Sequence, residues 1–77
     1  MSYAERCKII QKQLDELMRD IEAERKTADA KLSRFFAKRE LTKAEDAEVE
    51  RLEELIDLLE DRIDTVDRAG ATLSYFR

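Results

Sequence analysis

The chain has 77 residues, of which 44% are charged and 43% hydrophobic, and its formal net charge is −4. A single cysteine excludes an intrachain disulfide, and the absence of histidine removes the common zinc ligand sets and the usual neutral-pH general base. The one glycine lies near the C-terminus, so no glycine-rich loop is available to hold a phosphate. We therefore expect no enzyme, no catalytic residue, no cofactor and no bound metal.

The first predicted element is a helix over about residues 3–38. Its apolar residues recur in alternating steps of four and three, which is typical of the seam of a packed helix: Tyr3, Cys7, Ile10, Leu14, Leu17 and Ile21. Ser2 is a candidate N-cap, and Glu5 completes a capping box three residues later. The seam continues at seven-residue intervals through Ala28 and Phe35, but it weakens after Ile21. Because Cys7 lies on the seam, we expect a packed thiol rather than a reactive one.

A turn is predicted at about residues 39–42, although no glycine or proline marks it. Thr42 and Glu45 form a second capping box, which indicates the start of a helix. Basic residues precede this point and acidic residues follow it, which suits the dipoles of one helix that ends and another that begins.

The second predicted helix spans about residues 43–69, with an extension to 75 as the alternative. Its apolar seam again alternates steps of three and four: Val49, Leu52, Ile56, Leu59, Ile63, Val66, Gly70 and Leu73. Gly70 has two interpretations. It either ends the helix, as glycine commonly does, or it occupies a seam position that lets another backbone come close. We favour an end or fraying at Gly70.

Two long helices joined by a short turn predict an all-α fold, a single antiparallel helical hairpin over residues 1–77 packed through its heptads. Pairing the seams outward from the turn gives the expected contacts: Ile21 with Leu59, Leu14 with Val66, Cys7 with Leu73, and Tyr3 with Phe76.

A hairpin of this size buries little surface, so we expect it to associate with itself. A homodimer that forms a four-helix bundle, or a higher oligomer, would cover the apolar residues that flank the seams. These flank residues are Met18, Leu32, Phe36, Leu55, Leu58 and Phe76. The alternative is that some are scattered surface apolar residues, which are common.

A row of carboxylates follows the second predicted helix. They keep the four-three spacing of the seam over about 32 Å at 1.5 Å per residue, and they are Asp46, Glu50, Glu53, Asp57, Glu60, Asp64 and Asp67. Like charges four residues apart destabilise a helix by a few tenths of a kcal/mol per pair. The row therefore indicates a partner surface. The alternatives are a solvated face, or pairing with the more basic first helix.

Basic residues gather near the end of the first predicted helix, around Phe35 and Phe36. The candidate anion-binding residues are Arg25, Lys31, Arg34, Lys38 and Arg39. Bases interleaved with aromatic residues bind single-stranded nucleic acid and also occur in basic membrane segments. However, these bases suit a helix C-terminus, and the chain is net acidic. We therefore expect neither nucleic acid nor a membrane as the partner.

These features predict a small non-enzymatic binding or regulatory protein that presents an acidic helical face to a basic surface of a larger protein. Carboxylates at helical spacing imitate a line of phosphates, as in a nucleic-acid mimic or inhibitor such as a phage-type regulator. One alternative is a structural adaptor, or an assembly or secretion chaperone, that uses the apolar flanks. A second is an oligomer that captures an anionic nucleotide-like ligand at the basic end of the first helix. The lone thiol and the lack of a signal-peptide or membrane-span pattern predict a cytoplasmic location.

Overall fold

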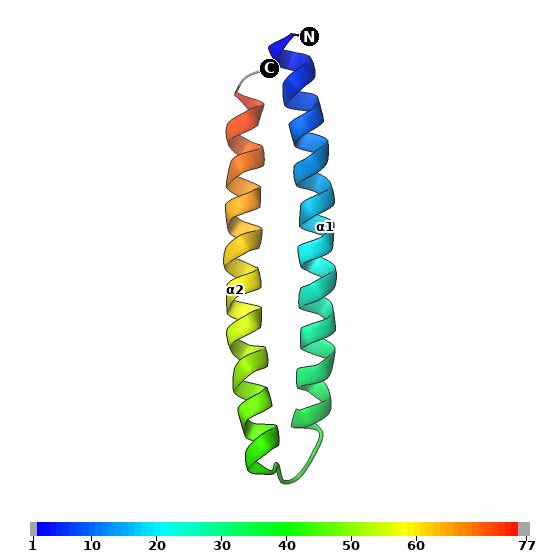
Figure 1. Cartoon of the computed structure of the whole chain (residues 1–77), viewed down its shortest axis with the longest axis vertical. Coiled ribbons are helices and arrows are strands. Elements are labelled where there is room, and N and C mark those ends of the chain that lie inside the picture. Colours follow the sequence, from blue (N-terminus) through cyan, green and yellow to red (C-terminus); the bar gives the residue numbers. More distant parts are fainter. Residues whose placement is uncertain (1, 76–77) are drawn as a thin grey trace.

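The structure, a computed structural model that describes residues 2–75, consists of two helices laid side by side (Figure 1). α1 spans Tyr3–Phe36 and α2 spans Lys43–Ser74. The helices run antiparallel, so that the start of α1 and the end of α2 lie at the same end of a rod of 58 × 15 × 14 Å. The predicted all-α helical hairpin is confirmed.

Capping side chains define where both helices begin. The Ser2 hydroxyl accepts a hydrogen bond from the Glu5 backbone N–H at 3.2 Å. The Thr42 hydroxyl accepts one from the Glu45 N–H at 3.1 Å, and the Glu45 carboxylate accepts one from the Thr42 N–H at 3.2 Å. The capping box predicted at Thr42 is therefore complete, and two backbone donors that a helix start leaves unpaired are satisfied.

The turn between the helices is held by side chains rather than by glycine or proline. α1 ends at Phe36, two residues before the predicted end, and the Lys38 N–H then donates to the Phe35 carbonyl at 3.1 Å in a tighter turn. Lys38 Nζ donates to the Glu45 carboxylate across the turn. This hydrogen bond, followed by the one from the Thr42 backbone, lowers the pKa of Glu45 below its ordinary value of 4.5. The ion pair thus connects the end of α1 to the first turn of α2.

α2 continues through Gly70 to Ser74, so the favoured prediction of a helix end at Gly70 is wrong and the longer alternative is correct. Gly70 does not adopt the positive φ of a helix-ending glycine. The Gln11 side chain of α1 lies against it instead, and a Cβ added at Gly70 would lie 3.4 Å from Gln11 Nε2. This glycine therefore occupies a seam position, but no backbone atom of α1 lies within 4 Å of the added Cβ, so the predicted close approach of another backbone is not seen.

Gly70→Ala is expected to raise the free energy of unfolding by about 0.5–1 kcal/mol. Alanine loses less backbone entropy than glycine when a helix forms, and the new methyl group meets only the end of a flexible side chain. Urea unfolding followed by circular dichroism, at one protein concentration, measures the change. A midpoint at or below that of the parent chain would mean that Gln11 cannot move aside and that the close approach requires glycine.

α1 contacts α2 through two columns of residues spaced seven apart, and only one of them was predicted. The predicted column is Cys7, Leu14, Ile21, Ala28 and Phe35, and the other is Gln11, Met18, Arg25 and Leu32; all nine residues are buried or half-buried. The column Tyr3, Ile10, Leu17, Glu24 and Lys31 is exposed. The predicted seam of α1 is therefore wrong on one side. Apolar residues occupy both flanking columns, so the pattern alone does not decide which flank turns toward α2.

The predicted seam of α2 is confirmed, because each of its residues from Val49 to Leu73 is buried or half-buried. Of the predicted contacts between the seams, Leu14 and Val66 line the same hollow between the helices. The predicted contact of Tyr3 with Phe76 lies outside the described residues.

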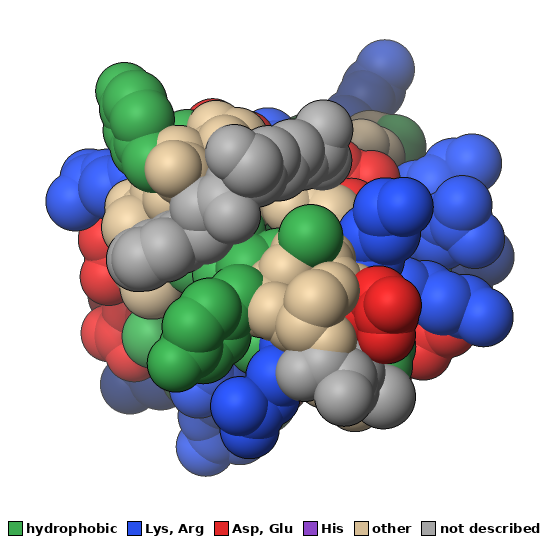
Figure 2. Space-filling model, turned by 90° about the horizontal axis from the view of Figure 1, so that it is seen from above, with side chains coloured by type: hydrophobic (Ala, Val, Ile, Leu, Met, Phe, Trp, Pro, Cys, Tyr) green, Lys and Arg blue, Asp and Glu red, His purple; other side chains and the backbone are tan. Residues whose placement is uncertain are grey.

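Among residues 2–75, buried side chains occur only in the half of the rod next to the turn, namely Ile21, Ala28, Val49, Leu52, Ile56 and Leu59. We call residues 3–20 and 60–75 the open half, and no described residue in it is buried. Figure 2 views the rod from this end and shows hydrophobic side chains at the surface among charged ones. The hairpin therefore completes a core only near its turn.

Candidate protein-binding surfaces

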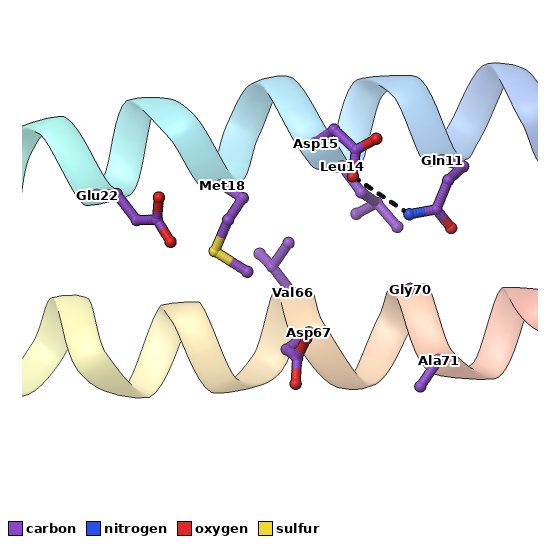
Figure 3. A pocket seen from close by; sticks show the side chains of 9 residues that line it. All are labelled: Gln11, Leu14, Asp15, Met18, Glu22, Val66, Asp67, Gly70 and Ala71. Carbon is purple, nitrogen blue, oxygen red and sulfur yellow. Dashed lines mark hydrogen bonds between the residues drawn. The ribbon is translucent and has the colours of Figure 1, made fainter.

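The seven predicted carboxylates of α2 are all exposed, and α1 adds three more to the same side of the hairpin. Asp15 and Glu22 line one hollow together with Asp67 (Figure 3). Asp29 lies 3.9 Å from Arg25, whose guanidinium reaches across to α2. We call these ten carboxylates the acidic face: Asp15, Glu22, Asp29, Asp46, Glu50, Glu53, Asp57, Glu60, Asp64 and Asp67. The contribution of α1 was not predicted, because only the pairing of the helices shows which side of α1 adjoins the row on α2.

Arg25 is the base whose ion pairs reach the acidic face. Its Nη2 lies 3.0 Å from Glu60 Oε1, and its Nε lies 3.9 Å from Asp29 Oδ2. Within residues 2–75, none of the other carboxylates of the α2 row has an ion-pair partner. Inside the hairpin, pairing between this row and the basic first helix is therefore limited to one arginine, and the remaining carboxylates face solvent.

A hollow of about 440 Å³ lies on the acidic side of the open half (Figure 3). Its floor is apolar, since Leu14, Met18 and Val66 line it, and the missing side chain of Gly70 helps to leave it open. Carboxylates line it too, and one of them, Asp15, accepts a hydrogen bond from the Gln11 amide at 3.3 Å. An apolar floor among carboxylates suits the aliphatic stem and cationic end of a lysine or arginine side chain.

The five predicted anion-binding residues do not form one site. Lys31, Arg34 and Lys38 line a hollow of about 410 Å³ near the turn, together with Phe35 and Glu48. Lys38 Nζ lies 5.7 Å from the centre of the Phe35 ring and also pairs with Glu45. Arg25 lies on the acidic side, and Arg39 is exposed in the turn. Carboxylates therefore compensate part of the charge that the three clustered bases bring together.

The predicted flank residues likewise do not form one surface. Met18 and Leu32 are half-buried in the contact between the helices, and Leu55 packs against the buried cluster near the turn. Phe36 and Leu58 are 64% and 46% exposed, at separate places on the rod. Phe76 lies outside the described residues.

Exposed apolar residues gather instead beside the seam, on the side away from the acidic face. Tyr3, Ile10 and Leu17 are 79%, 42% and 46% exposed and form one column of α1. Leu17 and Val66 line a hollow of about 420 Å³, and three charged residues, Asp20, Glu24 and Arg62, line it with them. We call the following six residues the apolar face, since they share this side of the open half: Tyr3, Ile10, Leu17, Val66, Ala69 and Leu73. The heptad spacing had identified Ile10 and Leu17 as important apolar positions but had assigned them to the contact with α2.

Comparison with known proteins finds no family model, no curated protein and no solved structure that matches this chain. Neither α1 nor α2 contains an apolar stretch long enough to cross a bilayer. Among residues 2–75, no three cysteine or carboxylate side chains are grouped so that they could hold a metal ion. The acidic face and the apolar face are the two surfaces of the hairpin that suit a binding partner.

Proposed function

We propose that this chain is a small cytoplasmic, non-enzymatic binding protein whose acidic face docks on a basic surface of a larger protein. The observation that carries the proposal is the row of seven exposed carboxylates on α2, which Asp15, Glu22 and Asp29 of α1 adjoin, with Arg25 paired among them and Lys26 beside them. Such a face attracts lysine and arginine side chains at long range and selects against acidic partners. A lone half-buried thiol, Cys7, suits a reducing compartment.

The two helices hold the carboxylates at fixed positions before any partner arrives. The α2 row extends about 32 Å at 1.5 Å per residue, and Asp15, Glu22 and Asp29 form a second row on α1 at seven-residue intervals. A preorganised charged surface loses little conformational entropy on binding. Two parallel rows of negative charge imitate nucleic-acid phosphates, so the preferred partner is a protein whose basic surface binds nucleic acid, and the expected effect is inhibition.

The test of this proposal changes three charges on the acidic face without changing side-chain size. The face variant carries Glu53→Gln, Asp57→Asn and Asp64→Asn, and the control carries Glu16→Gln, Glu54→Gln and Asp61→Asn. All six positions are exposed, and both variants lose three negative charges. Against an immobilised arginine-rich peptide at low salt, the face variant is expected to bind about tenfold more weakly, mainly through slower association, and the control to change less than threefold.

Equal weakening by the two triple variants would mean that net charge alone governs binding, and the acidic face would not be a docking surface. Unchanged binding by both would eliminate electrostatic recognition altogether. Circular dichroism on each variant checks that the hairpin is intact, since neutralising a row of like charges is expected to leave the helix as stable or slightly more stable.

We also propose that the protein works as a self-associated four-helix bundle, most simply a dimer. The support is the open half, in which no described residue is buried and large apolar side chains meet solvent. The same exposed residues favour a second candidate function, a structural adaptor that clasps a helix of another protein. If the protein is an adaptor rather than a self-associated bundle, the isolated chain is expected to remain a monomer.

A further inference from the structure

We infer that a second copy of this chain seats on the apolar face, so that the open half of one hairpin packs on the open half of another. The inference rests on the proposed self-association and is independent of what the acidic face binds. Its support comes from the surface area of the hairpin, the angular positions of the heptad columns, and the distribution of charge.

The hairpin exposes much more surface than a compact protein of its mass. Its accessible area is 6423 Å² at 9.1 kDa, whereas a compact monomer of that mass exposes about 4,900 Å². The excess of about 1,500 Å² exceeds the roughly 800 Å² that each partner contributes to a standard interface. The radius of gyration is 17.5 Å, against about 11.5 Å for a compact chain of this length. A standard interface with one further copy would cover about half of this excess.

The columns of α1 point in the directions that a four-helix bundle requires. At 3.5 residues per turn, the column of Gln11 and Met18 lies about 50° to one side of the column of Leu14, and the column of Ile10 and Leu17 lies about 50° to the other. The first of these turns toward α2, while the second is exposed. In a square bundle each helix contacts two neighbours roughly 90° apart. The exposed column is thus placed for a second neighbour.

Charge decides which surfaces of two copies meet. Two acidic faces repel each other, because each carries ten carboxylates. Full-length packing with the turns at opposite ends would set the apolar face of one copy against Lys31, Arg34 and Lys38 of the other, which lie on the same side of the rod near the turn. That arrangement would desolvate three charges against apolar side chains. Placing open half on open half matches apolar with apolar side chains, and the two charged residues of the open half beside them, Asp20 and Arg62, have opposite signs.

Two neighbouring isoleucines provide a matched test. Ile9 and Ile10 are 46% and 42% exposed, but only Ile10 belongs to the apolar face. Ile10→Glu is expected to raise the dissociation constant of the dimer about a hundredfold or more, because both copies bury the new charge. Ile9→Glu is expected to change it less than threefold. Sedimentation equilibrium measures both dissociation constants. Leu17→Glu, on the apolar face, and Leu58→Glu, outside it, repeat the comparison at two residues that are each 46% exposed.

A distance measurement tests the arrangement without disturbing the interface. Spin labels attached at Glu5→Cys, in a Cys7→Ala background, are expected to lie within about 30 Å of each other when open halves overlap. Full-length packing with opposed turns would separate them by about 45 Å, and that distance would overturn the inference. The inference would also be wrong if Ile9→Glu or Leu58→Glu dissociated the dimer while Ile10→Glu and Leu17→Glu did not. The proposed self-association would stand in that case. If the parent chain sediments as a monomer at every concentration, both the inferred arrangement and the proposed self-association are wrong.

Discussion

Leu59→Ala is expected to lower the free energy of unfolding by about 2–5 kcal/mol, which is the range for removing a buried leucine side chain. Leu59 is the one large side chain of residues 2–75 that is completely buried, with 0% of its surface exposed. A small domain has only about 5 kcal/mol or slightly more to lose. We therefore expect the variant to be largely unfolded at 37 °C, with a loss of helical circular dichroism and a large fall in the urea midpoint.

Leu58→Ala is the control for this loss, because Leu58 is the adjacent leucine and is 46% exposed. Alanine is an excellent helix former, so the control is expected to change the free energy of unfolding by less than about 1 kcal/mol. A loss at Leu58 as large as the loss at Leu59 would show that the outer side of α2 is covered in the assembled protein, and the interface would then lie there.

A hundredfold dilution is expected to lower the thermal unfolding midpoint by roughly 9 °C. If two 77-residue chains unfold together, the enthalpy of unfolding is about 110 kcal/mol at 0.7 kcal/mol per residue. Dilution by a factor of one hundred disfavours the dimer by about 2.7 kcal/mol, and the midpoint falls until entropy and enthalpy balance again. Circular dichroism melts in cells of different path length cover this concentration range.

A midpoint that stays constant on dilution, together with a single-chain mass by light scattering, would show that the hairpin is stable alone. Ile10→Glu provides an internal control. Its melt is expected to depend less on concentration than that of the parent chain, since the variant is already dissociated over most of the range.

The fold could be predicted from the sequence because its determinants are local. Ser2 and Thr42 lie directly before the helices that they cap, and the seam of α2 contains an apolar residue at nearly every position. Gly70 could not be assigned in this way, since glycine serves both as a helix end and as a point of close approach. The structure shows that α2 continues past it to Ser74, and that its nearest neighbour on α1 is the Gln11 side chain, 59 residues away in the chain.

The candidate surfaces were only partly predictable, because they depend on how α1 is rotated about its own axis. The four-three spacing identified the carboxylate row of α2, where one helix carries the whole pattern. It did not show that Asp15 and Glu22 join this row, nor that Arg25 lies with them rather than with Lys31. Each of these placements follows from a rotation of about 50° that turns Met18 rather than Leu17 toward α2.

The concentration of buried side chains near the turn also bears on the order in which the chain folds. Ala28 and Leu52, which pack together in the buried cluster, are 24 residues apart, whereas Leu14 and Val66 are separated by 52. Closing a loop is entropically more costly as the loop lengthens, so the strongest contacts lie where closure is least costly. Contacts between the helices can therefore form first beside the turn, where the capping box and the Lys38–Glu45 pair are located, and then extend toward the open half. The open half, with the least burial to gain within one chain, is expected to close last, and under the proposed self-association it would close when two copies meet.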